Sequence, residues 1–263
     1  MHICIEMVGE KDIVLPIHYN NITQGFIYNM IDRELSGFLH NKGYGEGRKF
    51  KLFCFSNIIG RSHIDRKSNN IIFKTPIKLE ISSPDEYFCE SFANTILKKE
   101  VKLGTNILEI GSIEISRQDV LEDKITLQTL SPITAYSTLL RPDGRKYTCF
   151  FQPGEEDFNR IVEENLRKKY YAYTEIQPPN DRVHFAPLTP PRLHIVKYKG
   201  FIIKGYTCKL KVEGPRQLLQ IAVDAGLGSK NSQGFGQHCV VYIQSFNALG
   251  SKNSQGFGCV RLL

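Results

Sequence analysis

The chain opens with an alternation of apolar and polar positions. Ile3, Ile5 and Met7 occupy every second position within residues 1–9. A period of two is typical of a strand with one face buried and one face in solvent. We therefore predict a half-buried strand at the start of the chain.

A helical period follows this strand after a turn-like stretch. Apolar side chains recur at helical spacing along residues 22–39, and either Asn20 or Asn21 is suited to cap the first turn. The pattern ends at His40, beside the glycine-rich residues 41–49. We expect a helix that leads directly to this histidine.

The remainder of the first half adds strands and one more helix. Strand candidates rich in Phe and Ile cover 51–59 and 69–82. A helix then begins at Pro84 and Asp85 and runs to about Lys99, and strands within 102–116 complete the first half. The order strand, helix, strand, strand, helix, strand is that of the ferredoxin-like fold.

The second half repeats this order. It begins near Ile125 with strand residues 125–137, followed by a hairpin that turns at Pro142–Gly144 and a helix over 155–171. A second hairpin over 192–213 turns at Lys199 and Gly200. The last helix has Pro215 at its first position and Gly226 at its end. The predicted fold class is α+β, with two ferredoxin-like domains in tandem, each an antiparallel βαββαβ sheet with helices on one face. We place the domains at residues 1–120 and 121–263.

Charge and cysteine content narrow the function. Lys and Arg exceed Asp and Glu by 34 to 27, which gives a net charge of +7 and favours an anionic partner such as nucleic acid or an acidic surface. The 7 cysteines are scattered with no C-x-x-C pair, which argues for reduced thiols and a cytoplasmic protein. Since no long apolar run occurs, we expect neither a signal peptide nor a membrane span.

The most specific local feature is a glycine-rich segment that occurs twice. LGSKNSQGFG stands at 227–236 and again at 249–258. The candidate RNA-binding residues at the first copy and directly before it are Gly226, Gly228, Lys230, Gly234, Phe235 and Gly236. Glycines let backbone N–H groups approach a phosphate, and the lysine adds positive charge. The spacing fits neither a Walker loop nor a Rossmann loop, so a flexible connection from helix to strand stays open as the alternative.

At this point the chain resembles the Cas-six family of CRISPR precursor-RNA endoribonucleases, of the RAMP superfamily. Members of that family close with a loop of the form G-h-G-x-x-x-x-x-G-F-G, which residues 226–236 fit throughout, and residues 15–57 and 130–137 are also similar to the family. The family carries one such loop, whereas this chain has a second copy within the tail 237–263. We expect the first copy, which follows a helix, to face RNA.

The resemblance implies a reaction and the residues that perform it. The family cuts RNA by attack of the 2′-hydroxyl on the adjacent phosphate, without metal or cofactor, which leaves a 2′,3′-cyclic phosphate and a 5′-hydroxyl. His40 matches the catalytic histidine as acid or base, Tyr28 the tyrosine that orients the reacting groups, and Lys51 the lysine that stabilises charge. A helix ending between Glu34 and Gly37 would bring His40 in from a following turn, since residues twelve apart differ by about 120° around a helix.

From the residues alone, each of these positions has a plainer interpretation. Tyr28 suits a helical core position, His40 a surface position beside a flexible loop, and Lys51 a solvated strand position. His18 and His63 are the rival histidines. His184 and His194 are ten apart and lack partners at zinc-ligand spacing, so no metal site is expected.

Two groups of basic residues are candidates for RNA binding. Lys197, Lys199 and Lys204 alternate with aromatic and apolar residues along 192–213, and Arg48 and Lys49 lie beside His40. Lysines neutralise phosphates and aromatic rings stack on bases. The alternative is an ordinary edge hairpin protected from aggregation by its lysines.

The family resemblance implies CRISPR repeat RNA, as precursor and as mature crRNA, to be the main partner. Other Cas proteins of an effector complex and a second copy of this chain are further expected partners. Two alternatives stay open: a catalytically inactive relative that holds crRNA, and a ferredoxin-like RNA-binding module without a CRISPR role. Against the second, the aromatic RRM signature does not appear as a clean match.

Overall fold

The computed structural model describes residues 1–241, so the second copy of the glycine-rich segment, at 249–258, lies outside the described residues. The helices are α1 (Asn20–Asn29), α2 (Arg33–Asn41), α3 (Glu86–Ile96), α4 (Glu156–Thr174) and α5 (Arg216–Ala225), with a short 3-10 helix η1 (Asn231–Gln233). The strands of the first half are β1 (His2–Val8), β2 (Ile13–Pro16), β3 (Cys54–Phe55), β4 (Ser62–Asp65), β5 (Asn70–Phe73), β6 (Ile77–Ser82), β7 (Val101–Leu103) and β8 (Asn106–Ser116). Those of the second half are β9 (Lys124–Thr129), β10 (Ala135–Leu140), β11 (Lys146–Phe151), β12 (His184–Pro187), β13 (Arg192–Tyr198), β14 (Phe201–Thr207), β15 (Lys209–Glu213) and β16 (His238–Val240).

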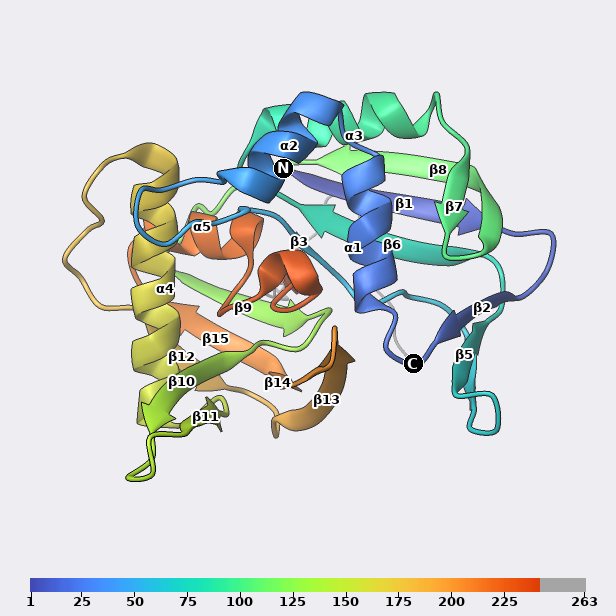
Figure 1. The fold of residues 1–263 in the computed structure, drawn as a ribbon. Coiled ribbons are helices and arrows are strands. Elements are labelled where there is room, and N and C mark those ends of the chain that lie inside the picture. The colour runs from blue at the N-terminus through green and yellow to red at the C-terminus, as the bar shows by residue number, and fades with distance from the viewer. Residues whose placement is uncertain (242–263) are drawn as a thin grey trace, which may run out of the picture.

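The first half forms a sheet in the order β3-β6-β1-β8-β7. The opening strand β1 lies in the middle and pairs antiparallel with both β6 and β8. Without the edge strand β7, this order is that of a ferredoxin-like domain, as the sequence predicts. Helices α1, α2 and α3 lie together over this half of the molecule (Figure 1).

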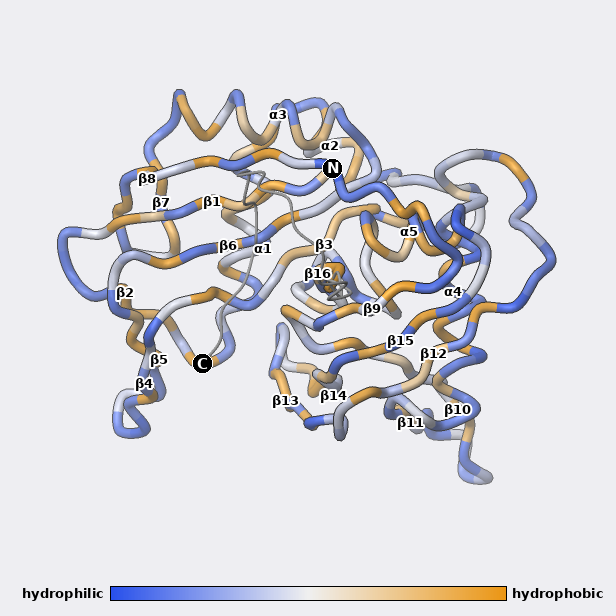
Figure 2. The backbone as a smooth tube through the Cα atoms, turned by 180° about the vertical axis from the view of Figure 1, so that it is seen from behind, coloured by the Kyte–Doolittle hydropathy of each residue, from blue (hydrophilic) through white to orange (hydrophobic). Residues whose placement is uncertain are grey.

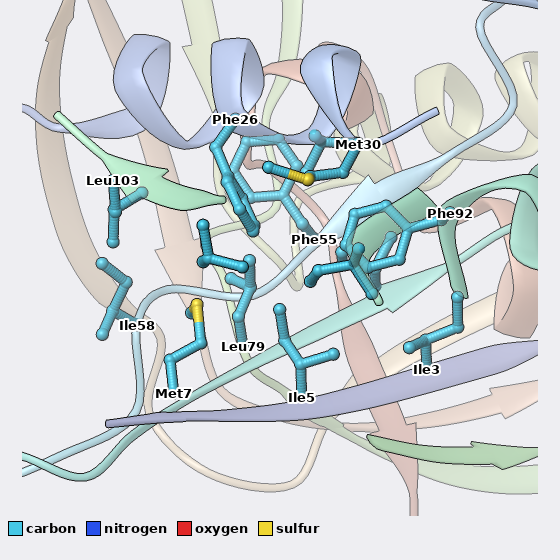
Figure 3. Close-up of a cluster of buried hydrophobic side chains, with 14 of the residues drawn as sticks. Ile3, Ile5, Met7, Phe26, Met30, Phe55, Ile58, Leu79, Phe92 and Leu103 are labelled. Carbon is cyan, nitrogen blue, oxygen red and sulfur yellow. The ribbon is translucent and has the colours of Figure 1, made fainter. Parts of the chain in front are cut away.

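The alternation along β1 builds the core of this half. Ile3, Ile5 and Met7 are at most 1% exposed, and they face Phe26 of α1 and Met30, the residue that follows this helix (Figure 3). Burying each such side chain stabilises the fold by roughly 1.5–3 kcal/mol. The predicted half-buried strand is confirmed, and its buried face holds the helices against the sheet.

The second half forms a sheet in the order β12-β15-β9-β16, which is the same arrangement of strands. Helices α4 and α5 pack against each other beside this sheet, and Gly226 ends α5 as expected. Two hairpins, β10–β11 and β13–β14, are inserted between the elements of this unit. The tandem ferredoxin-like fold is therefore confirmed, and the two main sheets lie side by side (Figure 2).

Several predicted element boundaries are wrong in the second half. The hairpin turning at Lys199 and Gly200 covers only β13 and β14, because Lys209–Glu213 leaves it as β15 and pairs with β9 and β12. Leu210 and Val212 of β15 are fully buried in the second core, which explains why this strand joins the sheet. Pro215 is the residue before α5 rather than its first residue.

The first half also departs from the prediction. The strand expected over 69–82 is divided at residues 74–76, and β5 pairs with β2 and β4 in a separate sheet. Pro76 has no N–H to donate and so interrupts the pairing. Of 51–59, only Cys54–Phe55 forms a strand. The predicted domain boundary at residue 120 falls between β8 and β9.

Candidate functional site

The helix expected to run to His40 is two helices. The first ends after Asn29, and Asp32 starts the second by accepting a hydrogen bond from the backbone N–H of Leu35 at 2.8 Å. Ser91 of α3 donates to the other carboxylate oxygen of Asp32 at 2.7 Å. The expected ending between Glu34 and Gly37 is thus wrong, because the first helix already ends after Asn29 and Asp32 caps a second one.

His40 lies in the last turn of α2 rather than in a following turn. Its side chain is exposed, and its Nδ1 lies 3.0 Å from Oδ1 of Asn41. The position leaves this imidazole accessible to a substrate in solvent.

Lys51 is brought to the same helix end. Its Nζ donates to the carbonyl oxygen of Leu39 and, at 3.1 Å, to that of His40. The lysine therefore satisfies two of the carbonyls that a helix terminus leaves without partners. Burial lowers its pKa below the usual value. The structure brings these two predicted site residues together, although eleven residues separate them in the sequence.

Tyr28 lies on α1, and its ring is half-buried. It packs edge-on against Phe53, two residues beyond Lys51, with the ring centroids 5.7 Å apart. Burial and, to a lesser extent, the nearby Tyr198 raise the pKa of its hydroxyl to about 12. A hydroxyl with this pKa stays protonated at neutral pH and can serve as a hydrogen-bond donor.

The rival histidines lie on other elements. His18 is half-buried in the connection between β2 and α1, and His63 is exposed on β4 of the small β2–β5–β4 sheet. Neither lies on the helix end that holds His40 and Lys51.

The glycine-rich residues 226–237, called here the glycine loop, are packed into the protein. Gly226, Gly228, Gly234 and Gly236 all have positive φ and are buried. At Gly234 a Cβ would lie 2.5 Å from Nδ2 of Asn20, and at Gly236 it would clash with the carbonyl oxygen of Leu227. These two glycines are required because no side chain fits where segments of the chain approach each other.

Much of the backbone of the glycine loop is hydrogen-bonded within the protein. The N–H groups of Leu227, Ser229 and Gly236 donate to carbonyl oxygens of Gly236, Thr134 and Pro132 at 2.9 Å each. Phe235 is fully buried and packs with Tyr198 and Ile203. These groups hold the loop in shape, so the surface open to a ligand is formed by the other parts of the loop.

The glycine loop also joins the two halves of the molecule. Asn20 Nδ2 donates to the carbonyl oxygen of Gln233 at 3.0 Å, and Gln24 Nε2 donates to that of Ser232 at 2.6 Å. Both donors lie on α1, the helix that carries Tyr28. Sequence reasoning missed both as site residues, although Asn20 stood out as a candidate helix cap.

Cations line the exposed side of this junction. Lys230 is half-exposed, and its Nζ lies 5.5 Å from the centroid of the Tyr136 ring. The guanidinium of Arg48 donates to Oγ of Ser229 at 3.2 Å and lies over the Phe50 ring. Lys49 is exposed beside it, with its Nζ bonded to the carbonyl oxygen of Gly45. Two predicted sites, the residues beside His40 and the glycine loop, therefore meet at Arg48.

The β13–β14 hairpin presents its lysines to solvent. Lys197, Lys199 and Lys204 are all exposed, and the register places Lys197 opposite Ile202 and Lys204 opposite Ile195. Ile195 and Ile202 are more than half exposed. At the tip, the hydroxyl of Tyr198 donates to Gln24 of α1, one helical turn from Tyr28. The hairpin thus reaches the helix that bears a candidate catalytic residue.

A buried cation supports the glycine loop from below. Lys169 of α4 is only 2% exposed, and its Nζ donates to the carbonyl oxygens of Gly226 at 2.6 Å and Ala225 at 3.3 Å. Burial lowers its pKa to about 7, while the nearby Cys54 thiol acts in the opposite direction. Sequence reasoning missed this residue, because a lysine in an amphipathic helix normally faces solvent.

Among residues 1–241, no group of three or more His, Cys, Asp or Glu side chains is arranged to hold a metal ion. Within the same residues, no helix is long and apolar enough to cross a membrane.

Comparison with known proteins shows which proteins this chain resembles. The C-terminal family model for the CRISPR associated protein Cas6 matches residues 115–240. Curated CRISPR-associated endoribonucleases named Cas6 are similar over most of their length. One from Methanocaldococcus jannaschii is 28% identical, with 94% of each chain covered, and one from Pyrococcus furiosus is 28% identical, with 90% of this chain and 88% of the relative covered.

Solved structures agree with this fold. A Cas6-related protein from Pyrococcus furiosus superimposes with a TM-score of 0.80 at 20% identity, covering 93% of this chain and 99% of that one. A structure described as a RAMP protein binding different RNA substrates gives a TM-score of 0.77 at 21% identity, covering 92% of this chain and all of that one. These structures share the tandem ferredoxin-like fold of this chain. The sequence matches show that the chain is similar to proteins named Cas6 over nearly its whole length.

Proposed function

We propose that this protein is an endoribonuclease that cuts CRISPR precursor RNA within its repeats to produce crRNA. The observation that carries the proposal is the pairing of Lys51 with the helix end that bears His40, at 3.1 Å from the His40 carbonyl oxygen. This pairing sets an exposed imidazole and a cation at one place, in a chain whose curated relatives are named CRISPR-associated endoribonucleases.

The proposed chemistry uses the nucleophile that RNA supplies. The 2′-hydroxyl attacks the adjacent phosphorus, the bond to the 5′ oxygen breaks, and the products carry a 2′,3′-cyclic phosphate and a 5′-hydroxyl. His40 acts as general acid or base, because histidine is the side chain most often used for proton transfer in catalysis. Such a group contributes roughly 10²–10⁴-fold to the rate.

The other two residues orient and stabilise. Tyr28 keeps its proton at neutral pH, since its pKa is raised to about 12, and so donates a hydrogen bond to the reacting groups. The ammonium of Lys51 has three N–H donors. Two of them bond the carbonyl oxygens of Leu39 and His40, and we assign the third to a phosphate oxygen that gains charge during the attack.

We propose repeat RNA as the partner along the exposed cations. Its phosphates contact Arg48, Lys49 and Lys230 near the cut, and the lysines of the β13–β14 hairpin further along the strand. The glycine loop contributes by holding Lys230 and Ser229 in place. Other Cas proteins and a second copy of this chain stay predictions.

The test is cleavage of a 5′-labelled repeat RNA, taken from the CRISPR array of the same genome, in EDTA. Wild type is expected to cut and leave a cyclic phosphate, whereas a 2′-deoxy nucleotide at the cut site blocks the reaction. His40→Ala should bind the RNA as wild type does and cut roughly 10²–10⁴-fold more slowly. His63→Ala, at another exposed histidine, is the matched control and should cut normally.

The other outcomes reassign the roles. Cutting by His40→Ala at the wild-type rate would remove His40 from the mechanism and direct attention to His18. If wild type binds the RNA tightly but never cuts it, the protein is the inactive crRNA-holding relative. Equal binding to unrelated single strands would instead identify a general RNA-binding module.

A further inference from the structure

The connection between β6 and α3, residues 83–85, makes three hydrogen bonds to two other segments of the chain. Ser83 Oγ donates to the carbonyl oxygen of Leu52 at 2.8 Å. The carbonyl oxygen of Pro84 accepts from the hydroxyl of Tyr173 of α4 at 2.7 Å. The carboxylate of Asp85 accepts from the hydroxyl of Tyr44 at 2.5 Å. Two of these contacts lie on the segment that contains Lys51.

That segment, residues 43–52, has a backbone constrained by several contacts on both sides of Lys51. The N–H of Gly43 donates to the carbonyl oxygen of Phe38 at 2.8 Å, which ends α2 immediately after His40 and Asn41. Tyr44 and Phe50 then exchange two backbone hydrogen bonds at 2.8 and 2.9 Å, which closes the loop between them. Leu52 has a φ of 51°, which is uncommon for a residue with a branched side chain.

Tyr44 is the anchor of this closed loop. Its ring packs edge-on against Phe38 of α2, with centroids 5.2 Å apart, and against Tyr173, with centroids 6.3 Å apart. Burial and the Asp85 carboxylate raise the pKa of its hydroxyl, so the hydroxyl remains a donor at neutral pH. Asp85 is itself fixed, because its other oxygen caps α3 by accepting from the N–H of Tyr87 at 3.0 Å.

The loop therefore has three fixed points around its functional residue. Gly43 fixes it to the end of α2, the Tyr44–Asp85 bond fixes it to α3, and the Leu52–Ser83 bond fixes it to the end of β6. Lys51 lies between the second and third points, and its Nζ reaches back to the His40 carbonyl oxygen. Phe50, which pairs with Tyr44, directly precedes Lys51 and so links Lys51 to the Tyr44 anchor.

We infer that Tyr44 and Asp85 are positioning residues for RNA cleavage, since their hydrogen bond sets the relative placement of Lys51 and His40. Neither residue is assigned to contact the RNA. The inference rests on the function proposed above. A small misplacement of catalytic groups has a large effect on rate and a small effect on binding.

Tyr44→Phe tests the bond without removing the ring. In single-turnover cleavage at saturating protein, the rate constant is expected to fall about tenfold, while the Kd for repeat RNA stays within about twofold. Tyr171→Phe removes a tyrosine hydroxyl from a half-exposed ring on α4 and is the matched control, with a wild-type rate expected. A Tyr44→Phe rate within about twofold of wild type overturns the inference.

Asp85 variants separate positioning from folding. Asp85→Asn retains a helix cap and an oxygen acceptor for Tyr44, so it should keep most of the rate, whereas Asp85→Ala should not. If the bond is what matters, the double variant Tyr44→Phe/Asp85→Ala is no slower than Asp85→Ala alone. Fully additive losses in the two single variants would mean that the residues act independently, against the inference.

A readout without RNA keeps this result distinct from the proposed activity. The ring signals of His40 in the NMR spectrum of the histidine-labelled protein should shift in Tyr44→Phe and not in Tyr171→Phe. If wild type fails to cleave, the proposed function fails, and the NMR comparison still decides whether Tyr44 positions the His40 end of α2. Unchanged His40 signals in Tyr44→Phe overturn the inference.

Discussion

The glycine loop at 226–237 and the segment at 43–52 look alike in sequence and differ in the structure. Both are rich in glycine and contain lysine or arginine. In the glycine loop, a Cβ at Gly236 would clash with the Leu227 carbonyl oxygen, whereas at Gly47 it would meet nothing within 4 Å. The glycine loop is an internal packing element, whereas residues 43–52 bury Gly43 but expose Gly47, Arg48 and Lys49.

This difference shows that glycine has two distinct uses in one protein. In the glycine loop it permits close contact of backbone segments, which joins the C-terminal half to α1 through Asn20 and Gln24. In residues 43–52 it permits a tight turn that leaves Arg48 and Lys49 in solvent. A glycine-rich motif alone does not say which use applies, because burial decides it.

The largest expected effect is on the packed side of this comparison. Gly236→Ala places a methyl group against a carbonyl oxygen at a residue whose φ is 77°. We expect the free energy of unfolding to fall by on the order of 3 kcal/mol, as measured by denaturant titration. Gly47→Ala, in open space with an ordinary φ, is the control and should change it by less than about 0.5 kcal/mol. Equal effects of the two substitutions would contradict the distinction.

A smaller effect is expected at the cation beneath the glycine loop. Lys169→Met leaves the carbonyl oxygens of Ala225 and Gly226 without their donor, which should cost about 2 kcal/mol. The wild-type protein should also gain stability relative to this variant as pH rises from 7 toward 9. The folded pKa of Lys169 is about 7, so above that pH the unfolded chain binds a proton that the folded protein lacks.

The window for this measurement ends near pH 9. Burial raises the pKa of the Cys54 thiol to about 12 from its usual value of 9.0. Above pH 9 the unfolded chain therefore loses a proton that the folded protein keeps, and stability falls. The difference between wild type and Lys169→Met, from denaturant titrations at pH 7, 8 and 9, isolates the lysine. A difference that does not change with pH would show that Lys169 keeps its charge when buried.

The fold could be predicted from the sequence because its signals are local and periodic. The alternation of Ile3, Ile5 and Met7 and the helix over 156–174 follow directly from the pattern of apolar residues. The division of the first helix was missed, because it depends on Asp32 receiving a hydrogen bond from Ser91 of a distant helix. The exit of β15 from its hairpin was missed for the same kind of reason, since it depends on which sheet has room for Leu210 and Val212.

The candidate site, like the fold, contains residues that could be predicted from the sequence and residues that could not. Resemblance supplied His40, Tyr28 and Lys51, but it could not supply their supports. Lys169 and the Tyr44–Asp85 pair act through contacts between residues 41 to 57 positions apart. No local pattern of charge or hydrophobicity records such contacts, so they become visible only when the folded chain brings the partners together.

The smallest expected effect lies where the two compared regions touch, between Arg48 and Ser229. Ser229→Ala removes a hydrogen bond of 3.2 Å from a partly exposed pair and should change stability by less than about 1 kcal/mol. Arg48→Ala should in addition lower the slope of log Kd for repeat RNA against log salt concentration by about one, because one phosphate contact is lost. Ser229→Ala should leave that slope unchanged, since the arginine keeps its charge. If both variants lower the slope equally, the glycine loop contributes a phosphate contact of its own. The glycine loop would then bind RNA as well as pack, and residues 43–52 would not be the only one of the two regions to bind it.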